Sequence, residues 1–464
     1  MIRTSVSLGG AMYRQAIRAV GIGLGFALLA GASLPGAAGA GSSTPRNVLL
    51  TKTKSHRGFQ QPVVAADPHR GGALAIAYHD AQQFQTCHLS LSSDGGRTWK
   101  KTALAGDGAQ FELSEDAYCW NPWVTFGPDS HIYYVFQTGV FFGRGDRHVY
   151  ITISRDGGKT FEEPKQLTPQ DPAADQFWPS VAVHQKSGRV YVVWDRLDSD
   201  FAFFADGVVE VAASDDEGRT FSIPVPIFPG LENNARAPVA AVGSGGQLYV
   251  GWLDVTQWNT QPGSLPATLK VSTSTDGQTF TMPVTIADPF IGIRRMHVLG
   301  ASPSGDGVAL TWWDLRDPDR NEKNLPGRVF VSLSEDAGAT WSEPRRAPIP
   351  RGRTNHQQRR PSVSLTGNGR VHLAYYDQSP KGVVNVYWTS TSDQGKTFSP
   401  PRRLNSVPFS NDVGPTDHVP GEPAWGDFLG IASSARRVFV AWTDSRRGEE
   451  VNGKQDIFFA GFRP

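Results

Sequence analysis

The segment Ser92-Ser93-Asp94-Gly95-Gly96-Arg97-Thr98-Trp99 decides the fold, because close copies of it recur along the chain. Each copy has Ser or Thr first, Asp third, Gly near the middle, and Thr followed by Trp or Phe at the end. The third-position aspartates are Asp94, Asp156, Asp216, Asp276, Asp336 and Asp393. Their spacings of 62, 60, 60, 60 and 57 residues indicate an architecture built from repeated units.

The residue types of this repeat suit a tight turn between two strands. Asp and Ser side chains hydrogen-bond to the backbone of such turns, and Gly adopts the positive φ that they need. The Trp or Phe that ends each copy suits burial against neighbouring strands. We therefore interpret the six aspartates as structural residues and not as catalytic ones.

A second unit precedes each repeat. It consists of an apolar segment, a turn with Gly, and an alternating strand that ends in an aromatic residue and, in most copies, an Asp. Alternation with period two indicates β-strands, and the Gly-containing turns indicate hairpins. Seven such units can be counted, beginning near Gln61-Pro62, Asn121-Pro122, Trp178-Pro179, Arg236-Ala237-Pro238, Arg295-Met296, Arg360-Pro361 and Glu422-Pro423.

The seventh unit has two more strands but no repeat after it. The segment 46–51 resembles the strands that follow the repeats, such as Arg402-Arg403-Leu404. We therefore predict an all-β fold, a β-propeller of seven four-stranded antiparallel blades. The N-terminal strand would complete the C-terminal blade and remove exposed sheet edges. Six blades is the alternative.

Residues 1–40 have the pattern of a secretory signal peptide. They carry three arginines, no acidic residue and a final Ala38-Gly39-Ala40. Their apolar run, about 14 residues, is shorter than the roughly 20 residues of a membrane-spanning helix, and no second run follows. We expect cleavage after Ala40, one propeller domain at 41–464, no membrane span, and secretion to the extracellular space or periplasm.

The composition indicates a turn-rich β protein, with 50 Gly, 33 Pro and only 19% charged residues. Without residues 1–40 the formal net charge of +1 becomes −2, and Lys and Arg are scattered, so we expect no nucleic-acid partner. Cys87 and Cys119 suit a disulfide in an exported chain, with two free thiols as the alternative. Two cysteines do not make a structural zinc site. We expect no metal, no cofactor and a monomer.

The repeat is similar to the Asp box of the sialidase-like propellers, also called BNR repeats. In those families the box lies on the turn between the two outer strands of each blade, remote from the active face. The resemblance therefore implies that catalysis takes place elsewhere. The best-known sialidases have six blades, so a seventh blade would displace any inherited site geometry.

The predicted active face is the channel mouth where inner strands begin and second strands end. The second strands end in aromatic residues and carboxylates, for which we expect a structural role in most copies. These ends are Tyr78-His79-Asp80, Trp194-Asp195-Arg196, Trp252-Leu253-Asp254, Trp312-Trp313-Asp314, Tyr376-Asp377 and Trp442-Thr443-Asp444, with Phe136-Gln137 as the exception.

Three inner-strand starts carry an arginine, at Arg236, Arg295 and Arg360, and we interpret these positions as equivalent. Guanidinium forks suit a carboxylate or sulfate. The resemblance implies that three arginines hold the sugar carboxylate, and Arg236-Ala237-Pro238 resembles the family's Arg-Ile-Pro motif. The family places that motif on its first blade, where this chain has Gln60-Gln61-Pro62. The alternative is that each arginine pairs with a neighbouring second-strand aspartate.

Glycoside cleavage needs an acid and a nucleophile or base, either two carboxylates or a Tyr with a carboxylate. Our candidates are Glu422, Asp427, Tyr118 and Asp314, with a turn residue as the alternative for each. Trp120 and Trp178 are candidates for stacking on a sugar ring, or for filling the channel wall.

The leading hypothesis is an exported sialidase-like glycoside hydrolase that acts on a terminal acidic sugar of glycans. The second is a non-catalytic propeller that binds glycan or protein at the channel mouth. A third is a polysaccharide lyase, which would need a Tyr or His base beside an arginine that neutralises a uronate. The expected partner is a glycan or another acidic saccharide.

Overall fold

The computed structural model describes residues 44–51, 58–80, 86–113, 117–140, 147–168, 174–197, 207–228, 235–255, 266–291, 297–314, 327–414, 426–448 and 454–464. The predicted signal peptide, Arg295 and Glu422 lie outside these ranges. Residues 43–464 form one compact unit. No helix in the described ranges has the length and apolarity of a membrane span.

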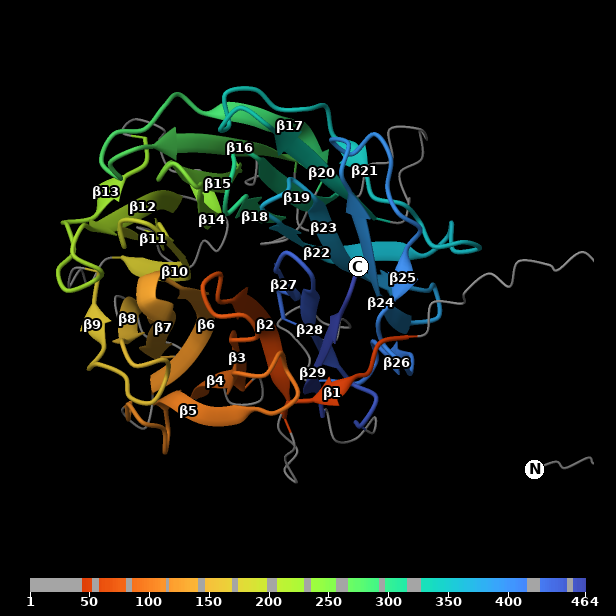
Figure 1. The fold of residues 1–464 in the computed structure, drawn as a ribbon, viewed down its shortest axis with the longest axis horizontal. Coiled ribbons are helices and arrows are strands. Elements are labelled where there is room, and N and C mark those ends of the chain that lie inside the picture. Colours follow the sequence, from red (N-terminus) through yellow and green to blue (C-terminus); the bar gives the residue numbers. More distant parts are fainter. Residues whose placement is uncertain are drawn as a thin grey trace, which may run out of the picture. The chain divides into compact units, whose positions relative to one another are not determined.

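Seven antiparallel sheets form the ring of blades in Figure 1, which confirms the predicted blade count. Blade 1 contains β2 (Phe59–Ala66), β3 (Leu74–Asp80), β4 (Thr86–Ser92) and β5 (Lys100–Gly106). Blade 2 contains β6 (Ala117–Phe126), β7 (Ile132–Val140), β8 (His148–Ser154) and β9 (Lys165–Gln166). Blade 3 contains β10 (Asp175–Val183), β11 (Val190–Leu197), β12 (Gly207–Ser214) and β13 (Val225–Pro226).

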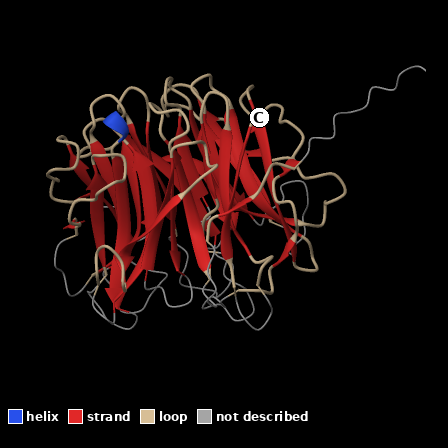
Figure 2. Ribbon diagram, turned by 60° about the horizontal axis from the view of Figure 1, so that its bottom comes forward, coloured by secondary structure: helices blue, strands red, loops and turns tan. Residues whose placement is uncertain are grey.

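The second half of the ring has the same order of strands. Blade 4 contains β14 (Ala235–Val242), β15 (Leu248–Asp254), β16 (Pro266–Ser274) and β17 (Val284–Ile291). Blade 5 contains β18 (His297–Ala301), β19 (Val308–Asp314), β20 (Arg328–Ser334) and β21 (Arg345–Arg346). Blade 6 contains β22 (Gln357–Leu365), β23 (Val371–Gln378), β24 (Val383–Thr391) and β25 (Arg402–Arg403), and β26 (Phe409–Ser410) also pairs with β24. The described part holds one short 3-10 helix, Pro128–Ser130, drawn blue in Figure 2.

Blade 7 joins the two ends of the described chain. It contains β27 (Gly430–Ser433), β28 (Val438–Asp444), β29 (Asp456–Phe462) and the N-terminal β1 (Val48–Leu49). In the register of β1 with β29, Val48 lies opposite Phe459. The predicted closure by an N-terminal strand is therefore confirmed, and it pairs the outer edge of the last blade.

The six repeats form turns that follow the third strand of blades 1 to 6, and we call these segments the repeat turns. In the first, Ser92 Oγ donates to Asp94 Oδ1 (2.9 Å) and accepts from the Gly96 N–H (2.9 Å), while Asp94 Oδ1 accepts from the Thr98 N–H (2.9 Å). Every repeat turn has the same Ser or Thr to Asp hydrogen bond. The repeated residues therefore serve one local geometry.

The repeat turns also pack against the preceding blade. A Cβ added to Gly96 would lie 2.2 Å from Phe459 Cε1 of blade 7, and one added to Gly158 would lie 2.1 Å from Leu91 Cδ1 of blade 1. The backbone at Gly96 also has φ +85, which other residues rarely adopt. Glycine at this position thus lets each turn contact its neighbour.

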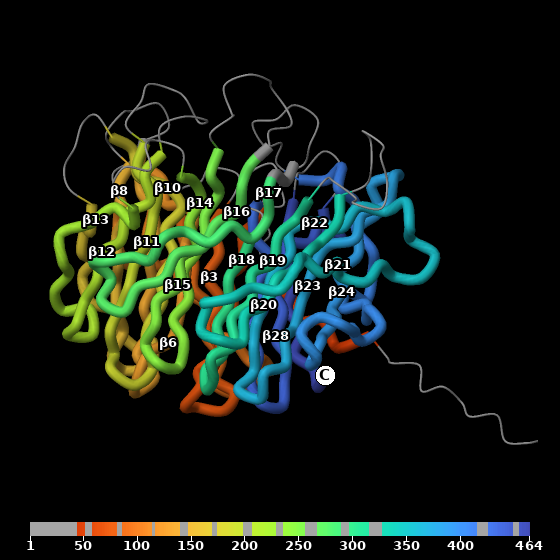
Figure 3. The backbone as a smooth tube through the Cα atoms, turned by 90° about the horizontal axis from the view of Figure 1, so that it is seen from above, coloured from red at the N-terminus to blue at the C-terminus, as the bar shows by residue number. Residues whose placement is uncertain are grey.

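The inner and second strands define two faces of the ring, seen from the side in Figure 3. At one end of blade 1, Phe59 pairs with Asp80, and at the other end Ala66 pairs with Leu74. We call the first end, where inner strands begin and second strands end, the mouth face. The opposite end carries the repeat turns, and we call it the repeat face.

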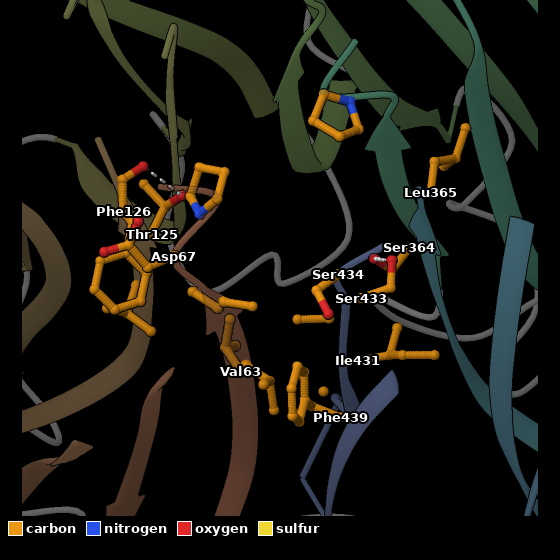
Figure 4. Close-up of a pocket in the computed structure, with 18 of the residues that line it drawn as sticks. Val63, Asp67, Thr125, Phe126, Ser364, Leu365, Ile431, Ser433, Ser434 and Phe439 are labelled. Carbon is orange, nitrogen blue, oxygen red and sulfur yellow. Dashed lines mark hydrogen bonds between the residues drawn. The ribbon is translucent and has the colours of Figure 1, made fainter. Parts of the chain in front are cut away.

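A cavity of about 1160 Å³ lies in the central channel. Its wall is made by inner-strand residues such as Val63, Ser364 and Ile431 (Figure 4), and it reaches Asp94 and Arg97 of the first repeat turn. The Oγ atoms of Ser364 and Ser433 are 2.8 Å apart across β22 and β27. This cavity therefore extends to the repeat face, and none of the predicted catalytic residues in the described ranges lines it.

Candidate functional site

The inner strands begin on the mouth face with a bulge next to a proline. In five blades the strand register shifts by one residue at this point. The residue before each proline has a positive φ: Gln61 57°, Asn121 48°, Trp178 50°, Ala237 53° and Arg360 47°. Non-glycine residues in this region carry strain, and bulges of this kind redirect side chains. The bulge thus decides which side chain reaches the channel and which faces a neighbouring blade.

The predicted equivalence of the arginines is wrong by one residue. Arg236 pairs opposite Leu253 before its bulge, and in blade 6 it is Arg359 that occupies this position, opposite Tyr376. Arg360 takes the next, positive-φ position together with Ala237. The reason is that both blades place the bulge by their proline, and Arg360 directly precedes Pro361 whereas Arg236 is two residues from Pro238.

Arg236 is held by a buried carboxylate. Its Nε donates to Asp195 Oδ2 at 2.8 Å, and the two side chains are 3% and 0% exposed. The Ala237 N–H donates to the same oxygen at 3.2 Å, and the guanidinium carbon lies 5.2 Å from the centre of the Trp178 ring. Arg236 thus adopts the alternative role, in which the arginine pairs with a second-strand aspartate.

The aspartates at the ends of the second strands do not all point to the same side of their sheets. Asp195 precedes Arg196, whereas in blades 4, 5 and 7 a Trp stands two residues before the aspartate. Because strand side chains alternate, Asp195 points to the opposite side of its sheet from Asp254, Asp314 and Asp444. Asp254 pairs with Lys270, and Asp444 with Arg446 at 2.6 Å. The pair of Asp444 is buried and that of Asp254 is partly buried, and both favour a structural role for these aspartates.

The candidate Asp314 is buried, with 4% of its surface exposed, and lies opposite Arg328 in the register of β19 with β20. Asp427, the second described carboxylate candidate, accepts a hydrogen bond from Gln61 Nε2 at 3.4 Å. The structure places Asp427 beside the blade 1 bulge. Its predicted partner Glu422 lies outside the described residues.

Tyr118 belongs to a network that connects blades 2 and 3. Its hydroxyl accepts a hydrogen bond from Arg147 Nε at 2.8 Å, and Arg147 Nη1 forms an ion pair with Asp175 at the start of β10. Burial raises the pKa of the Tyr118 hydroxyl, so the phenol stays protonated at neutral pH. The Trp120 ring lies edge-on to Tyr118, with ring centres 6.0 Å apart.

Arg147 retains capacity for a ligand. Its side chain is 15% exposed, its carbon CZ lies 5.1 Å from the Phe177 ring centre, and Nη2 has no hydrogen-bond partner in the described structure. The neighbouring His79 is fully buried, and burial lowers its pKa to about 3. His79 is therefore neutral and adds no positive charge to this network.

Next to the network, Cys87 and Cys119 form a disulfide between β4 and β6, with their Cα atoms 5.5 Å apart. It joins blades 1 and 2 directly beside Tyr118.

A second group on the mouth face was not predicted from the sequence. His356, in the loop that leads into β22, has its Nδ1 2.8 Å from Oδ2 of Asp377, which is 0% exposed. Arg353 Nη1 donates to the same oxygen at 2.8 Å. The only local signal is a His close to an inner-strand start, and it does not reveal a partner 21 residues later in the chain.

No protein-family model and no curated protein matches the chain. Among solved structures it is similar to an ulvan lyase of polysaccharide lyase family PL25 bound to -[GlcA(1-4)Rha3S]-, with 11% identity, coverage of 87% of this chain and 94% of the lyase, and a TM-score of 0.52. The chain is 12% identical to a Hadza microbial sialidase, and the match covers 85% of this chain and 74% of the sialidase with a TM-score of 0.45. It is 11% identical to a Trypanosoma rangeli sialidase, and that match covers 74% of this chain and 56% of the sialidase with a TM-score of 0.43. With a TM-score of 0.52, the chain shares the β-propeller fold of the ulvan lyase. At these identities the likeness shows the fold alone.

Two groups on the mouth face thus place a Tyr or His side chain beside an arginine that is partly exposed, by 15% and 26%. One is Tyr118 with Arg147, and the other is His356 with Arg353. In the described ranges no three His, Cys, Asp or Glu side chains gather as metal ligands. Guanidinium donors of this kind suit an anionic group on a ligand.

Proposed function

We propose that the protein is an exported enzyme that binds an acidic saccharide on its mouth face and hydrolyses the glycosidic bond of a terminal acidic sugar. The observation that carries the proposal is the contact of the Tyr118 hydroxyl with Arg147 Nε at 2.8 Å, next to an Nη2 that has no partner in the described structure. In this arrangement Nη2 binds the sugar carboxylate, and Trp120 offers an aromatic surface to the ring.

Hydrolysis adds water across the glycosidic bond, so one group must protonate the leaving oxygen while another assists attack at the anomeric carbon. Tyr118 carries a proton at neutral pH and lies beside a cation, and Asp427 is the carboxylate candidate on the same face. A Tyr and a carboxylate on one face are the residue types that a sialidase-like reaction uses. Because Arg236 is paired with Asp195, we assign the binding of the sugar carboxylate to Arg147 instead.

A second candidate function is a non-catalytic propeller that binds an acidic glycan at the same place. It is favoured by the raised pKa of the Tyr118 hydroxyl, because a protonated phenol is a poor nucleophile. It is also favoured by the buried pair of Arg236 with Asp195, which withdraws one predicted ligand arginine.

The test is hydrolysis of a fluorogenic sialoside and a panel of other acidic glycosides, with binding to the same saccharides measured by calorimetry. Arg147→Met and Tyr118→Phe are compared with Arg219→Met, which changes an arginine 60% exposed at a repeat turn. Turnover that is lost in the first two variants and kept in the third supports the hydrolase. Binding without turnover supports the non-catalytic propeller. Absence of both for every acidic saccharide contradicts the proposal.

A further inference from the structure

His356 has the hydrogen bonding of a proton acceptor. Its Nδ1 lies 2.8 Å from Asp377 Oδ2 and 3.4 Å from Arg353 Nη1, and the tautomer in which Nδ1 donates to the carboxylate satisfies the closer contact. The remaining nitrogen, Nε2, then holds the lone pair. Nε2 has no hydrogen-bond partner in the described structure, is not one of the buried unpaired atoms, and belongs to a side chain that is 15% exposed. A buried carboxylate behind an accessible imidazole orients it for proton transfer.

Arg353 supplies an anion site beside this imidazole. Nη1 donates to Asp377 Oδ2 at 2.8 Å, and the carbon CZ lies 5.6 Å from the centre of the Tyr387 ring. The guanidinium also forms a side-chain hydrogen bond with Tyr387, and the side chain is 26% exposed, so part of the fork can reach a ligand. Two N–H vectors of one guanidinium suit a carboxylate. Asp377 contacts the guanidinium of Arg353 through Nη1. Arg353 can therefore still bind an anion through its other N–H groups.

The loop that carries both residues is held by buried groups. Arg328, 3% exposed, donates from Nη1 to the carbonyl of His356 and from Nη2 to the carbonyl of Thr354, both at 2.6 Å. The His356 N–H donates to the Arg353 carbonyl at 3.0 Å. Gln358, fully buried, donates to the Pro348 carbonyl at 3.0 Å. The imidazole and guanidinium are therefore positioned before any ligand arrives.

We propose that His356, oriented by Asp377, is the catalytic base of a β-elimination that cleaves a polysaccharide containing a uronate, with Arg353 binding the uronate carboxylate. The proposal rests on the proposed function for the acidic saccharide class, and it goes beyond it in the site, on blades 5 and 6, and in the reaction. A cation on the carboxylate acidifies the adjacent C–H, and a base next to that cation can remove its proton.

The step is balanced without a further reactant. Nε2 takes the proton from C5 of the uronate, the C–H electron pair forms the C4–C5 double bond, and the C4–O bond to the next sugar breaks. The leaving oxygen takes a proton from solvent, and His356 later returns its proton to solvent. The products are a saccharide with an unsaturated uronate end and a shortened saccharide, with no net consumption of water.

The test uses the full chain on a panel of uronate polysaccharides, including glucuronate-rhamnose sulfate polymers. The ultraviolet absorbance of the conjugated double bond reports elimination, and a reducing-sugar assay reports all cleavage. We expect His356→Gln to lower kcat by about 100-fold or more. We expect Arg353→Met to act mainly on KM. The controls are His184→Gln, whose imidazole is hydrogen-bonded to Ser187 and Ser244 on the repeat face, and Asp444→Asn, a buried paired aspartate of blade 7.

A pH profile of the wild type needs no variant and tests the base directly. The charged and titratable groups around the imidazole are Asp377, Arg353, Arg328 and Tyr387. We expect the elimination rate to rise with pH, because only an unprotonated Nε2 can accept the C5 proton. Asp377→Asn should lower kcat and change this profile, which the loss of a purely structural contact would not do.

Three outcomes would overturn the proposal, and they separate it from the proposed function. Hydrolysis of acidic glycosides without any unsaturated product from the uronate panel refutes the elimination and leaves the proposed function standing. Unsaturated product at an unchanged rate in a folded His356→Gln or His356→Asn refutes the role of His356. Neither binding nor cleavage of any acidic saccharide refutes both.

Discussion

Arg236 Nε of blade 4 lies 2.8 Å from Asp195 Oδ2 of blade 3, and both side chains are buried. The pair therefore crosses a blade boundary on the mouth face. We predict that Asp195→Ala lowers the free energy of unfolding by about 3–5 kcal/mol, because it leaves a guanidinium buried without its counter-charge. Urea denaturation of the purified protein at neutral pH measures this change.

The control is Asp215→Ala, since Asp215 forms an ion pair with Arg189 on the repeat face and is 74% exposed. Exposed pairs contribute little, so a loss of about 1 kcal/mol or less is expected there. Equal effects of the two substitutions would contradict the assignment of Arg236 to a structural role. Arg236 would then again be a candidate for binding the sugar carboxylate.

The disulfide between Cys87 and Cys119 closes a loop of 32 residues across the boundary of blades 1 and 2. We predict that the double variant Cys87→Ser, Cys119→Ser loses about 2–4 kcal/mol of unfolding free energy, mainly because the unfolded chain is then less constrained. Denaturation of the wild type with and without reductant should show the same difference. A reductant effect that persists in the double variant would show that the loss has another cause.

The fold could be predicted from the sequence because each repeat turn is stabilised by hydrogen bonds within the turn itself. Ser92 and Asp94 bond to the backbone of their own turn, so their effect does not depend on distant residues. The seven units counted beside the six repeats then indicated seven blades, and the segment 46–51 resembled the strands that follow the repeats. Repeated local chemistry is what a single sequence reveals most directly.

The site could not be predicted to the same extent, because it depends on contacts between distant residues. Arg360 directly precedes Pro361 and takes the positive-φ position of the bulge, whereas Arg236 lies one residue earlier relative to Pro238. The alternation of side chains likewise puts Asp195 on the other side of its sheet from Asp444. His356 meets Asp377 only because the loop before β22 turns back onto β23. Composition and spacing carry no information on that loop conformation.

Gly96 tests how closely the repeat turns contact the preceding blade. An added Cβ would lie 2.2 Å from Phe459 Cε1, so Gly96→Ala must displace a buried aromatic ring of blade 7. We predict a loss of about 1–3 kcal/mol for this overpacking, in addition to the cost of a positive φ. Thermal or urea unfolding measures the change.

The matched control is Gly108→Ala, because Gly108 has φ +62 and an added Cβ there would meet nothing within 4 Å. It carries the cost of the backbone conformation without the clash, so the difference between the two variants isolates the packing of the turn. If the two variants lose the same stability, the turn of blade 1 can move away from Phe459 at no cost.

The repeat-turn aspartates predict how the fold responds to acid. Hydrogen bonds from the Thr side chain and backbone N–H groups lower the pKa of Asp336 and of Asp393 from 3.8 to about 2. A carboxyl group whose pKa is lower in the folded state stabilises the fold fully above its unfolded pKa, and this contribution is lost as pH falls through the folded pKa. We therefore predict that unfolding free energy decreases between about pH 4 and pH 2 through these groups. The double variant Asp336→Asn, Asp393→Asn should be less stable than the wild type at pH 7, and the difference should shrink across that window.

Glu163→Gln, which removes an exposed carboxylate without a hydrogen bond in the described structure, should leave the wild-type pH dependence intact. A difference between wild type and double variant that stays constant from pH 7 to pH 2 would show that the turns do not depend on the ionised carboxylates.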